Sequence, residues 1–241
     1  MSGVWAGAAA PGWLTAGLAG GALVGAAAWA VRGRSSQVFG PSLWLGNPSR
    51  PRVALTFDDG PSPATEAILD LLRKFSARAT FFQIGQAALS RPELARRVSG
   101  EGHEIGNHTL SHAALYAKTP AGVYGEVSGA QRVLQEIHGG APRWFRAPYG
   151  CRWFGLRDAL RDHGLTGVMW SCLGLDWKRP ARAVAARVIA HAGNGSIICL
   201  HDGRAGQPGA DCRVTVEALR LILPALRQRQ LELVTLSEVF R

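Results

Sequence analysis

The sequence predicts an α/β protein, a distorted (β/α)7 barrel that is related to the eight-stranded TIM barrel and preceded by an N-terminal hydrophobic helix. Seven short apolar runs alternate with helical patterns from residue 52 onward, which indicates a parallel sheet with helices outside it. Titratable residues follow several of these runs, as expected where the carboxyl ends of barrel strands carry a site. With 47% apolar and 18% charged residues, the chain can bury a sizeable core.

The first segment, residues 1–34, is hydrophobic and signal-like. Residues 3–31 contain no charged residue, and Arg32 and Arg34 close the run. A bilayer-spanning helix needs roughly 20 apolar residues, so we expect a membrane anchor here. Because Pro11 and many glycines weaken the pattern, a buried or interfacial helix is the alternative. Proline and glycine pairs then predict a linker over 35–51, followed by one folded domain over 52–241.

The elements of that domain follow from apolar runs and from helical spacing. Ser62 and Pro63 supply the cap and first turn of the first helix. The expected strands are 53–57, 79–84, 103–107, 144–147, 165–172, 196–200 and 231–236. The expected helices are 64–75, 92–98, 121–137, 154–163, 181–190 and 214–228.

Net charge and cysteine spacing limit which binding partners, structural metal sites and disulfides we expect. A net charge of +10 is compatible with a plain basic surface or with attraction for anionic lipid head groups or cell-wall polymers. No dense basic run or aromatic-interleaved basic stripe is present, so nucleic acid is not expected. The four cysteines form no C-x-x-C pair, so a structural zinc cluster is not expected. A Cys172–Cys199 disulfide and buried free thiols are the two alternatives, and we favour the thiols.

Two motifs predict a metal-dependent site. Asp58 and Asp59 follow the first strand, and two adjacent carboxylates repel each other unless a cation or a raised pKa relieves the repulsion. His108 and His112 are four residues apart, which places them on one side of a helical turn. One carboxylate with two imidazoles is a zinc-type catalytic ligand set that leaves a position open for water.

With these motifs the chain resembles the polysaccharide deacetylase family, also called the NodB-homology domain or carbohydrate esterase family 4, over about residues 51–240. The motifs that carry the resemblance are Thr56-Phe57-Asp58-Asp59-Gly60, His108-Thr109-Leu110-Ser111-His112, Arg146-Ala147-Pro148-Tyr149-Gly150, Asp176-Trp177 and Leu200-His201-Asp202. Two departures affect substrate fit. Leu173 stands where the family often has aspartate, and Cys199 stands where it often has leucine.

The resemblance implies a role for each site residue. Asp59, His108 and His112 are expected to bind a divalent metal, most simply Zn²⁺, with Co²⁺, Ni²⁺ or Fe²⁺ as alternatives. Four residues are expected to be catalytic, and four to bind substrate. The catalytic group comprises the base Asp58, its partner Arg146, the acid His201 and its partner Asp176. The substrate-binding group comprises Pro148, Tyr149, Trp177 and Leu200.

The expected function is metal-dependent removal of N-acetyl groups from N-acetylhexosamine residues of a glycan. The candidate glycans are peptidoglycan, a chitin-like oligosaccharide and a lipid-linked sugar. The alternatives are an amidohydrolase or esterase with another substrate, and a membrane-anchored glycan-binding pseudoenzyme. An envelope glycan places the domain outside the cytoplasm, whereas Arg32 and Arg34 favour the cytoplasmic side. The ordinary structural alternatives are a packed helix start for the two histidines, a core histidine for His201, and core packing for Trp177 and Tyr149.

Overall fold

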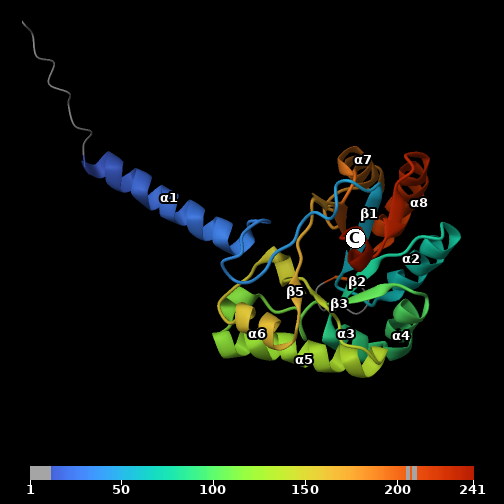
Figure 1. Ribbon diagram of the computed structural model, residues 1–241, viewed down its shortest axis with the longest axis horizontal. Helices are drawn as coiled ribbons and strands as arrows, with labels where there is room; N and C mark the ends of the chain where they lie inside the picture. Colours follow the sequence, from blue (N-terminus) through green and yellow to red (C-terminus); the bar gives the residue numbers. More distant parts are fainter. Residues whose placement is uncertain (1–11, 205–206, 208–210) are drawn as a thin grey trace, which may run out of the picture.

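The fold is a curled, parallel sheet with helices packed around it (Figure 1). The computed structural model describes residues 12–204, 207 and 211–241. Every ladder between the described strands is parallel, and the strand order is β5-β4-β3-β2-β1-β7-β6, with β8 paired to β1. The strands are β1 (Arg52–Asp58), β2 (Thr80–Gln83), β3 (Glu104–Asn107), β4 (Trp144–Phe145), β5 (Thr166–Gly167), β6 (Cys172–Leu173), β7 (Ser196–His201) and β8 (Glu232–Val234).

One segment joins the two edges of the sheet. The run expected as a single strand over 165–172 is divided into β5, which pairs with β4, and β6, which pairs with β7. The sheet must therefore curl until residues 166–173 connect both edges. With β5 and β6 counted as one interrupted strand, its eight strands make the seven-stranded arrangement of a distorted (β/α)7 barrel. The prediction of a single fifth strand was wrong in this detail, because a continuous apolar run cannot reveal a change of partner.

The helices cover the outside of the sheet, and α1 projects away from it (Figure 1). The described helices include every predicted one, and two further short α-helices lie at 85–90 and 236–239. Their bounds are α1 (Gly12–Arg32), α2 (Pro63–Lys74), α3 (Gly85–Ser90), α4 (Pro92–Gly100), α5 (Pro120–His138), α6 (Leu156–Asp162), α7 (Ala181–His191), α8 (Arg213–Gln228) and α9 (Leu236–Val239), with 3₁₀ turns η1 (Leu115–Ala117) and η2 (Pro148–Gly150).

Helix α2 illustrates how local sequence holds the barrel wall. The Ser62 side chain accepts from the Ala64 N–H, and Pro63 occupies the first turn, where no N–H is needed. Ile68, Leu69 and Leu72 are fully buried against the sheet. Burying each such side chain contributes about 1.5–3 kcal/mol, so this face fixes the loop that follows β1.

The N-terminal segment meets the domain through its backbone. The Arg152 guanidinium donates to the carbonyl oxygens of Val31, Gly33 and Ser36. Residues 35–51, expected as a linker, also lie against the barrel, since Leu43 forms a bridge to Val168. Among the described residues no helix is long and apolar enough to cross a membrane, so the transmembrane part of the expectation for 1–34 is not supported. Residues 1–11 lie outside the described part of the chain.

All four cysteines are free and buried. Cys172 and Cys199 lie on the neighbouring strands β6 and β7, where Cys172 pairs with Ile198 and Leu173 pairs with Cys199. The interpretation as buried thiols is confirmed.

Candidate active site

A cavity of about 400 Å³ lies at the carboxyl ends of the strands. Its wall brings together residues that lie up to 175 positions apart in the sequence. The described residues that line it are Arg32, Asp58, Asp59, His108, His112, Ala147, Tyr149, Gly150, Trp170, Leu173, Trp177, Cys199, His201, Arg204 and Gln207.

The turn after β1 separates the two aspartates. Asp58 ends the strand and is buried, whereas Asp59 has a left-handed backbone with a φ of 76°. Gly60 follows because a Cβ there would lie 2.0 Å from Asp202 Oδ2. The side chain of Thr65 donates to that same carboxylate oxygen at 2.6 Å. The motif therefore needs glycine to let the turn pack against the end of β7.

Asp59 faces two imidazoles. Its Oδ1 lies 3.2 Å from His108 Nε2 and 3.0 Å from His112 Nε2, and all three side chains are buried or nearly so. Burial alone would raise the pKa of Asp59, but the two imidazoles beside it outweigh burial and hold the pKa well below its usual range. In the same way, burial would lower the pKa of His108, but the hydrogen bond to Asp59 and the nearby carboxylates raise it.

The two histidines reach the site from an irregular loop. We predicted a helical turn over 108–112, and this is wrong, since the segment contains no helix. Thr109 and His112 instead have left-handed backbones, with φ of 67° and 59°. The Asn107 side chain accepts from the Thr109 N–H, and the Thr109 hydroxyl oxygen accepts from the His112 N–H. These local bonds bring the imidazole centroids within 5.0 Å without a helix.

The Asp59, His108 and His112 side chains fit a divalent metal ion. His108 Nδ1 lies 2.7 Å from the Arg146 carbonyl oxygen, which can only accept, so Nδ1 carries a proton and Nε2 is the nitrogen that could bind a metal ion. Two ligand atoms on a tetrahedral ion with bonds of 2.0–2.1 Å are about 3.3 Å apart, close to the 3.0 and 3.2 Å found here. The three ligand atoms lie within 4.8 Å of one another.

Arg146 holds the other aspartate. Its side chain is fully buried, and Nη1 donates to Asp58 Oδ1 and to Thr56 Oγ1, each at 2.7 Å. Nη2 donates to the Met169 carbonyl oxygen, and the guanidinium carbon lies 4.2 Å from the centroid of the Phe82 ring. These contacts fix the position of the guanidinium. They engage only Oδ1 of Asp58, so Oδ2 can contact another group. That oxygen accepts from the Cys199 thiol at a sulfur–oxygen distance of 3.4 Å.

His201 and Asp176 form a second pair across the cavity. His201 Nδ1 lies 2.9 Å from Asp176 Oδ1, while Asp176 Oδ2 accepts from the His201 backbone N–H and the Thr215 hydroxyl. Burial alone would lower the pKa of His201, but the Asp176 charge and hydrogen bond outweigh it and raise that pKa to about 9. Burial alone would raise the pKa of Asp176, but the charge and hydrogen bonds of His201 lower it.

Two of the four residues expected to bind substrate line the cavity. Tyr149 and Trp177 are half-exposed there, with ring centroids 4.8 Å from His112 and 4.9 Å from His201. Pro148 is buried just behind the lining. Leu200 is fully buried in the core and does not line the cavity, because side chains alternate along β7 and its neighbours Cys199 and His201 take the cavity face. The expectation for Leu200 is therefore not supported.

Some cavity residues were not singled out by sequence reasoning. Trp170 lies between β5 and β6, inside the run taken for one strand, so its exposure to the cavity was hidden. Arg32 comes from the end of α1, which is held by distant contacts such as those of Arg152 with the Val31 and Gly33 carbonyl oxygens. Arg204 and Gln207 follow β7, in a loop with no recognisable pattern.

The chain resembles known proteins over most of its length. The polysaccharide deacetylase family model matches residues 45–168. A chitooligosaccharide deacetylase of Azorhizobium caulinodans is 40% identical over 186 residues, which is 73% of this chain and 89% of that protein. A peptidoglycan-N-acetylglucosamine deacetylase of Bacillus cereus is 37% identical over 202 residues, 78% of this chain and 88% of that protein.

Among solved structures, the Bc1960 peptidoglycan N-acetylglucosamine deacetylase, in complex with a naphthalenyl N-oxidanyl-benzamide, superposes with a TM-score of 0.77. It is 32% identical, and the alignment covers 82% of this chain and 92% of that one.

Proposed function

Because the chain belongs to the polysaccharide deacetylase family, we propose that it is a metal-dependent hydrolase that removes N-acetyl groups from N-acetylhexosamine residues of a glycan and releases acetate. The observation that carries the proposal is the gathering of three units on one cavity. These units are the Asp59–His108–His112 group, the Asp58–Arg146 pair and the Asp176–His201 pair.

Asp59, His108 and His112 would hold the metal. Two neutral imidazoles and one carboxylate suit Zn²⁺ best, with Co²⁺, Ni²⁺ and Fe²⁺ as alternatives. Such an ion, when bound, polarises a carbonyl group and makes a water molecule more acidic. The hydrogen bond from His108 Nδ1 to the Arg146 carbonyl oxygen supports this assignment, because it fixes the tautomer that a metal ligand needs.

Asp58 would act as the general base. Arg146 occupies Oδ1, so Oδ2 is the oxygen that takes a proton from the attacking water. The buried guanidinium holds this carboxylate in one orientation. A base within reach of the nucleophile contributes about 10²–10⁴-fold to the rate.

Tyr149 would stabilise the charge that develops on the acetyl oxygen. It lies in the η2 turn with a φ of 58°, next to His112. None of the hydrogen bonds among the described residues uses its backbone N–H, so this donor can serve as an oxyanion contact. The exposed rings of Tyr149 and Trp177 would stack against the sugar.

His201 would act as the general acid that protonates the departing amine. Its Nδ1 is held by Asp176, so Nε2 is the nitrogen that can donate towards the cavity. With its pKa raised to about 9, the imidazole is protonated at neutral pH, as this step requires. Asp176 acts through His201 and is a positioning residue.

We propose that the domain works on the extracytoplasmic side, where envelope glycans lie. The substrates named for the relatives support this side, and Arg32 and Arg34 would oppose it only if the segment before them crossed a membrane. Fusion of an export-dependent phosphatase to the C-terminus tests the proposal. Phosphatase activity supports the outer side, and its absence with stable fusion protein contradicts it.

Acetate release tests the reaction itself. The full chain, stripped of metal and then reconstituted with Zn²⁺ or Co²⁺, is assayed on chitooligosaccharides and on peptidoglycan fragments. Release from either substrate that depends on the metal supports the proposal. Hydrolysis of simple esters or small amides alone would instead support the amidohydrolase or esterase alternative.

A further inference from the structure

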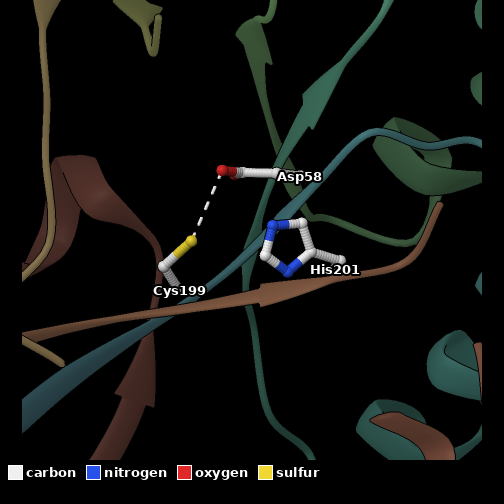
Figure 2. Close-up of side chains that lie close together, drawn as sticks. All are labelled: Asp58, Cys199 and His201. Carbon is white, nitrogen blue, oxygen red and sulfur yellow. Dashed lines mark hydrogen bonds between the residues drawn. The ribbon is translucent and has the colours of Figure 1, made fainter. Parts of the chain in front are cut away.

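Cys199 lies in the lining of the cavity, beside the proposed base and the proposed acid (Figure 2). It is two residues before His201 on β7, so both side chains point to the same face of the sheet. In the pairing of β1 with β7, Asp58 lies opposite His201 and Thr56 lies opposite Cys199. Two neighbouring strands thus bring a carboxylate, a thiol and an imidazole together.

Each of these three side chains directs one ligand atom at the others. Arg146 holds Asp58 Oδ1, which leaves Oδ2 to face the Cys199 sulfur at 3.4 Å. Asp176 holds His201 Nδ1, and Figure 2 shows the other ring nitrogen on the side of Asp58 and Cys199. The three ligand atoms lie within 4.8 Å of one another. Metal-binding histidines typically have their second nitrogen held by a carboxylate in this way, and their carboxylate co-ligands are hydrogen-bonded too.

We propose that Asp58, Cys199 and His201 form a second metal site that binds thiophilic divalent ions such as Zn²⁺ and Cd²⁺ and inhibits the enzyme. Thiolate sulfur, imidazole nitrogen and carboxylate oxygen together suit borderline and soft ions, whereas Mg²⁺ and Ca²⁺ prefer oxygen ligands alone. The site shares no ligand with the Asp59–His108–His112 group, so both can be filled in one molecule.

Binding is an exchange of one ion for two protons. The Cys199 thiol loses its proton to solvent and becomes a thiolate, and the His201 imidazolium loses one and becomes neutral. A doubly charged ion thus replaces two positive charges, and the net charge of the cavity is unchanged. This matters because positive charge is already present when the enzyme is active, from the metal at Asp59, from Arg32 and Arg204 in the cavity lining, and from the Arg146 guanidinium behind it.

Inhibition follows from the proposed function, on which this step rests. An ion in the second site occupies Asp58 Oδ2 and His201 Nε2, the two atoms that would accept and donate protons. The enzyme would need one metal ion and be inhibited by a second. A leucine in place of Cys199 removes the sulfur ligand, so Cys199→Leu is the informative variant, with Cys199→Ser as a smaller change that also lacks a thiolate.

The experiment titrates the full chain, already loaded with one equivalent of Zn²⁺, with Cd²⁺. Bound metal is counted by equilibrium dialysis and elemental analysis, and the ultraviolet sulfur-to-cadmium charge-transfer band is recorded. The wild type should bind a second equivalent and develop the band, whereas Cys199→Leu and Cys199→Ser should do neither. Cys172→Ala removes a buried thiol on the neighbouring strand β6 and should behave as the wild type.

Inhibition by excess zinc gives the second readout. The concentration that halves activity, measured relative to each variant's own activity, should rise at least about 100-fold in Cys199→Leu, because even outer-shell changes weaken metal binding about 10–100-fold. A wild type that binds only one equivalent, or a band that persists in Cys199→Leu, would overturn the proposal. If no form released acetate, the proposed function would fail, but stoichiometry and the band would still decide the second site.

Discussion

Replacing Asp176 by asparagine tests the proposed acid most sharply. The substitution keeps the shape of the side chain and an oxygen for the Thr215 hydroxyl, but it removes the charge beside His201. In the wild type that charge overcomes burial and raises the pKa of His201 from 6.5 to about 9. The difference corresponds to about 3 kcal/mol in favour of the imidazolium. Without the charge, burial is opposed only by the charges of Asp58 and Asp59, so the pKa of His201 should fall back towards 6.5.

The effect on rate depends on pH. At pH 7.5 a group with a pKa of 9 is about 97% protonated, and one with a pKa of 6.5 is about 9% protonated. Asp176→Asn should therefore lose about tenfold in kcat/KM at pH 7.5 through protonation alone, and much less at pH 6. The apparent pKa of the high-pH limb of the kcat/KM profile should fall by about two units. Thr215→Val, which leaves the charge in place, is the matched control and should keep the wild-type limb.

The same pair also links folding stability to pH. Because the pKa of His201 is raised in the folded protein, its stabilisation is complete below about pH 6.5 and is lost as the pH rises through about 9. Nuclear magnetic resonance titration of the His201 ring in the metal-free protein measures the pKa directly. An equal loss of activity at pH 6 and pH 8 in Asp176→Asn, with an unchanged His201 pKa, would refute the reasoning.

Three further substitutions test the remaining parts of the site. Asp58→Asn should reduce deacetylation by about 10²–10⁴-fold while bound metal, counted by elemental analysis, stays at one equivalent; loss of metal instead would mean that the two aspartates have been assigned the wrong way round. Arg146→Met should destabilise the fold by about 3–5 kcal/mol in denaturant unfolding, because it leaves the buried Asp58 carboxylate unpaired; adding Asp58→Asn should recover part of that loss, and an additive double variant would contradict the pairing. Gly60→Ala should cost about 3 kcal/mol, since the new Cβ would meet the Asp202 carboxylate, and a melting temperature equal to that of the wild type would argue against this packing.

The general architecture could be predicted because alternation of strands and helices is a local signal. The seven apolar runs overlapped all eight described strands, and capping residues such as Ser62 marked helix starts. The strand with which a segment pairs depends on distant residues and not on the local sequence. For this reason the division of 165–172 into β5 and β6 was missed. The packing of residues 35–51 on the barrel rests on contacts with distant residues such as Val168, which no linker-like composition reveals.

The residues of the candidate site could be predicted from short motifs, whereas their loop conformation and strand register could not. Short motifs identified Asp58, Asp59, His108, His112, Arg146, Asp176 and His201, and all seven meet at one cavity or directly behind it. The helical turn expected over 108–112 is absent. The Asn107 and Thr109 side chains accept backbone hydrogen bonds there and hold a loop in which Thr109 and His112 have left-handed backbones. Leu200 lies in the core and not in the cavity lining, and a sequence motif does not show which face of a strand a residue occupies. The contact of the Cys199 thiol with Asp58 depends on the register between β1 and β7, which only the structure supplies.

The most direct test of the central claim is acetate release from chitooligosaccharides and peptidoglycan fragments by the full chain, measured metal-free and after addition of one equivalent of Zn²⁺. We predict no release without metal, release with one equivalent, and loss of that release in Asp58→Asn at unchanged metal content. Metal-independent release, or tight binding of zinc with no release from either glycan, would contradict the assignment of this cavity as a metal-dependent deacetylase site.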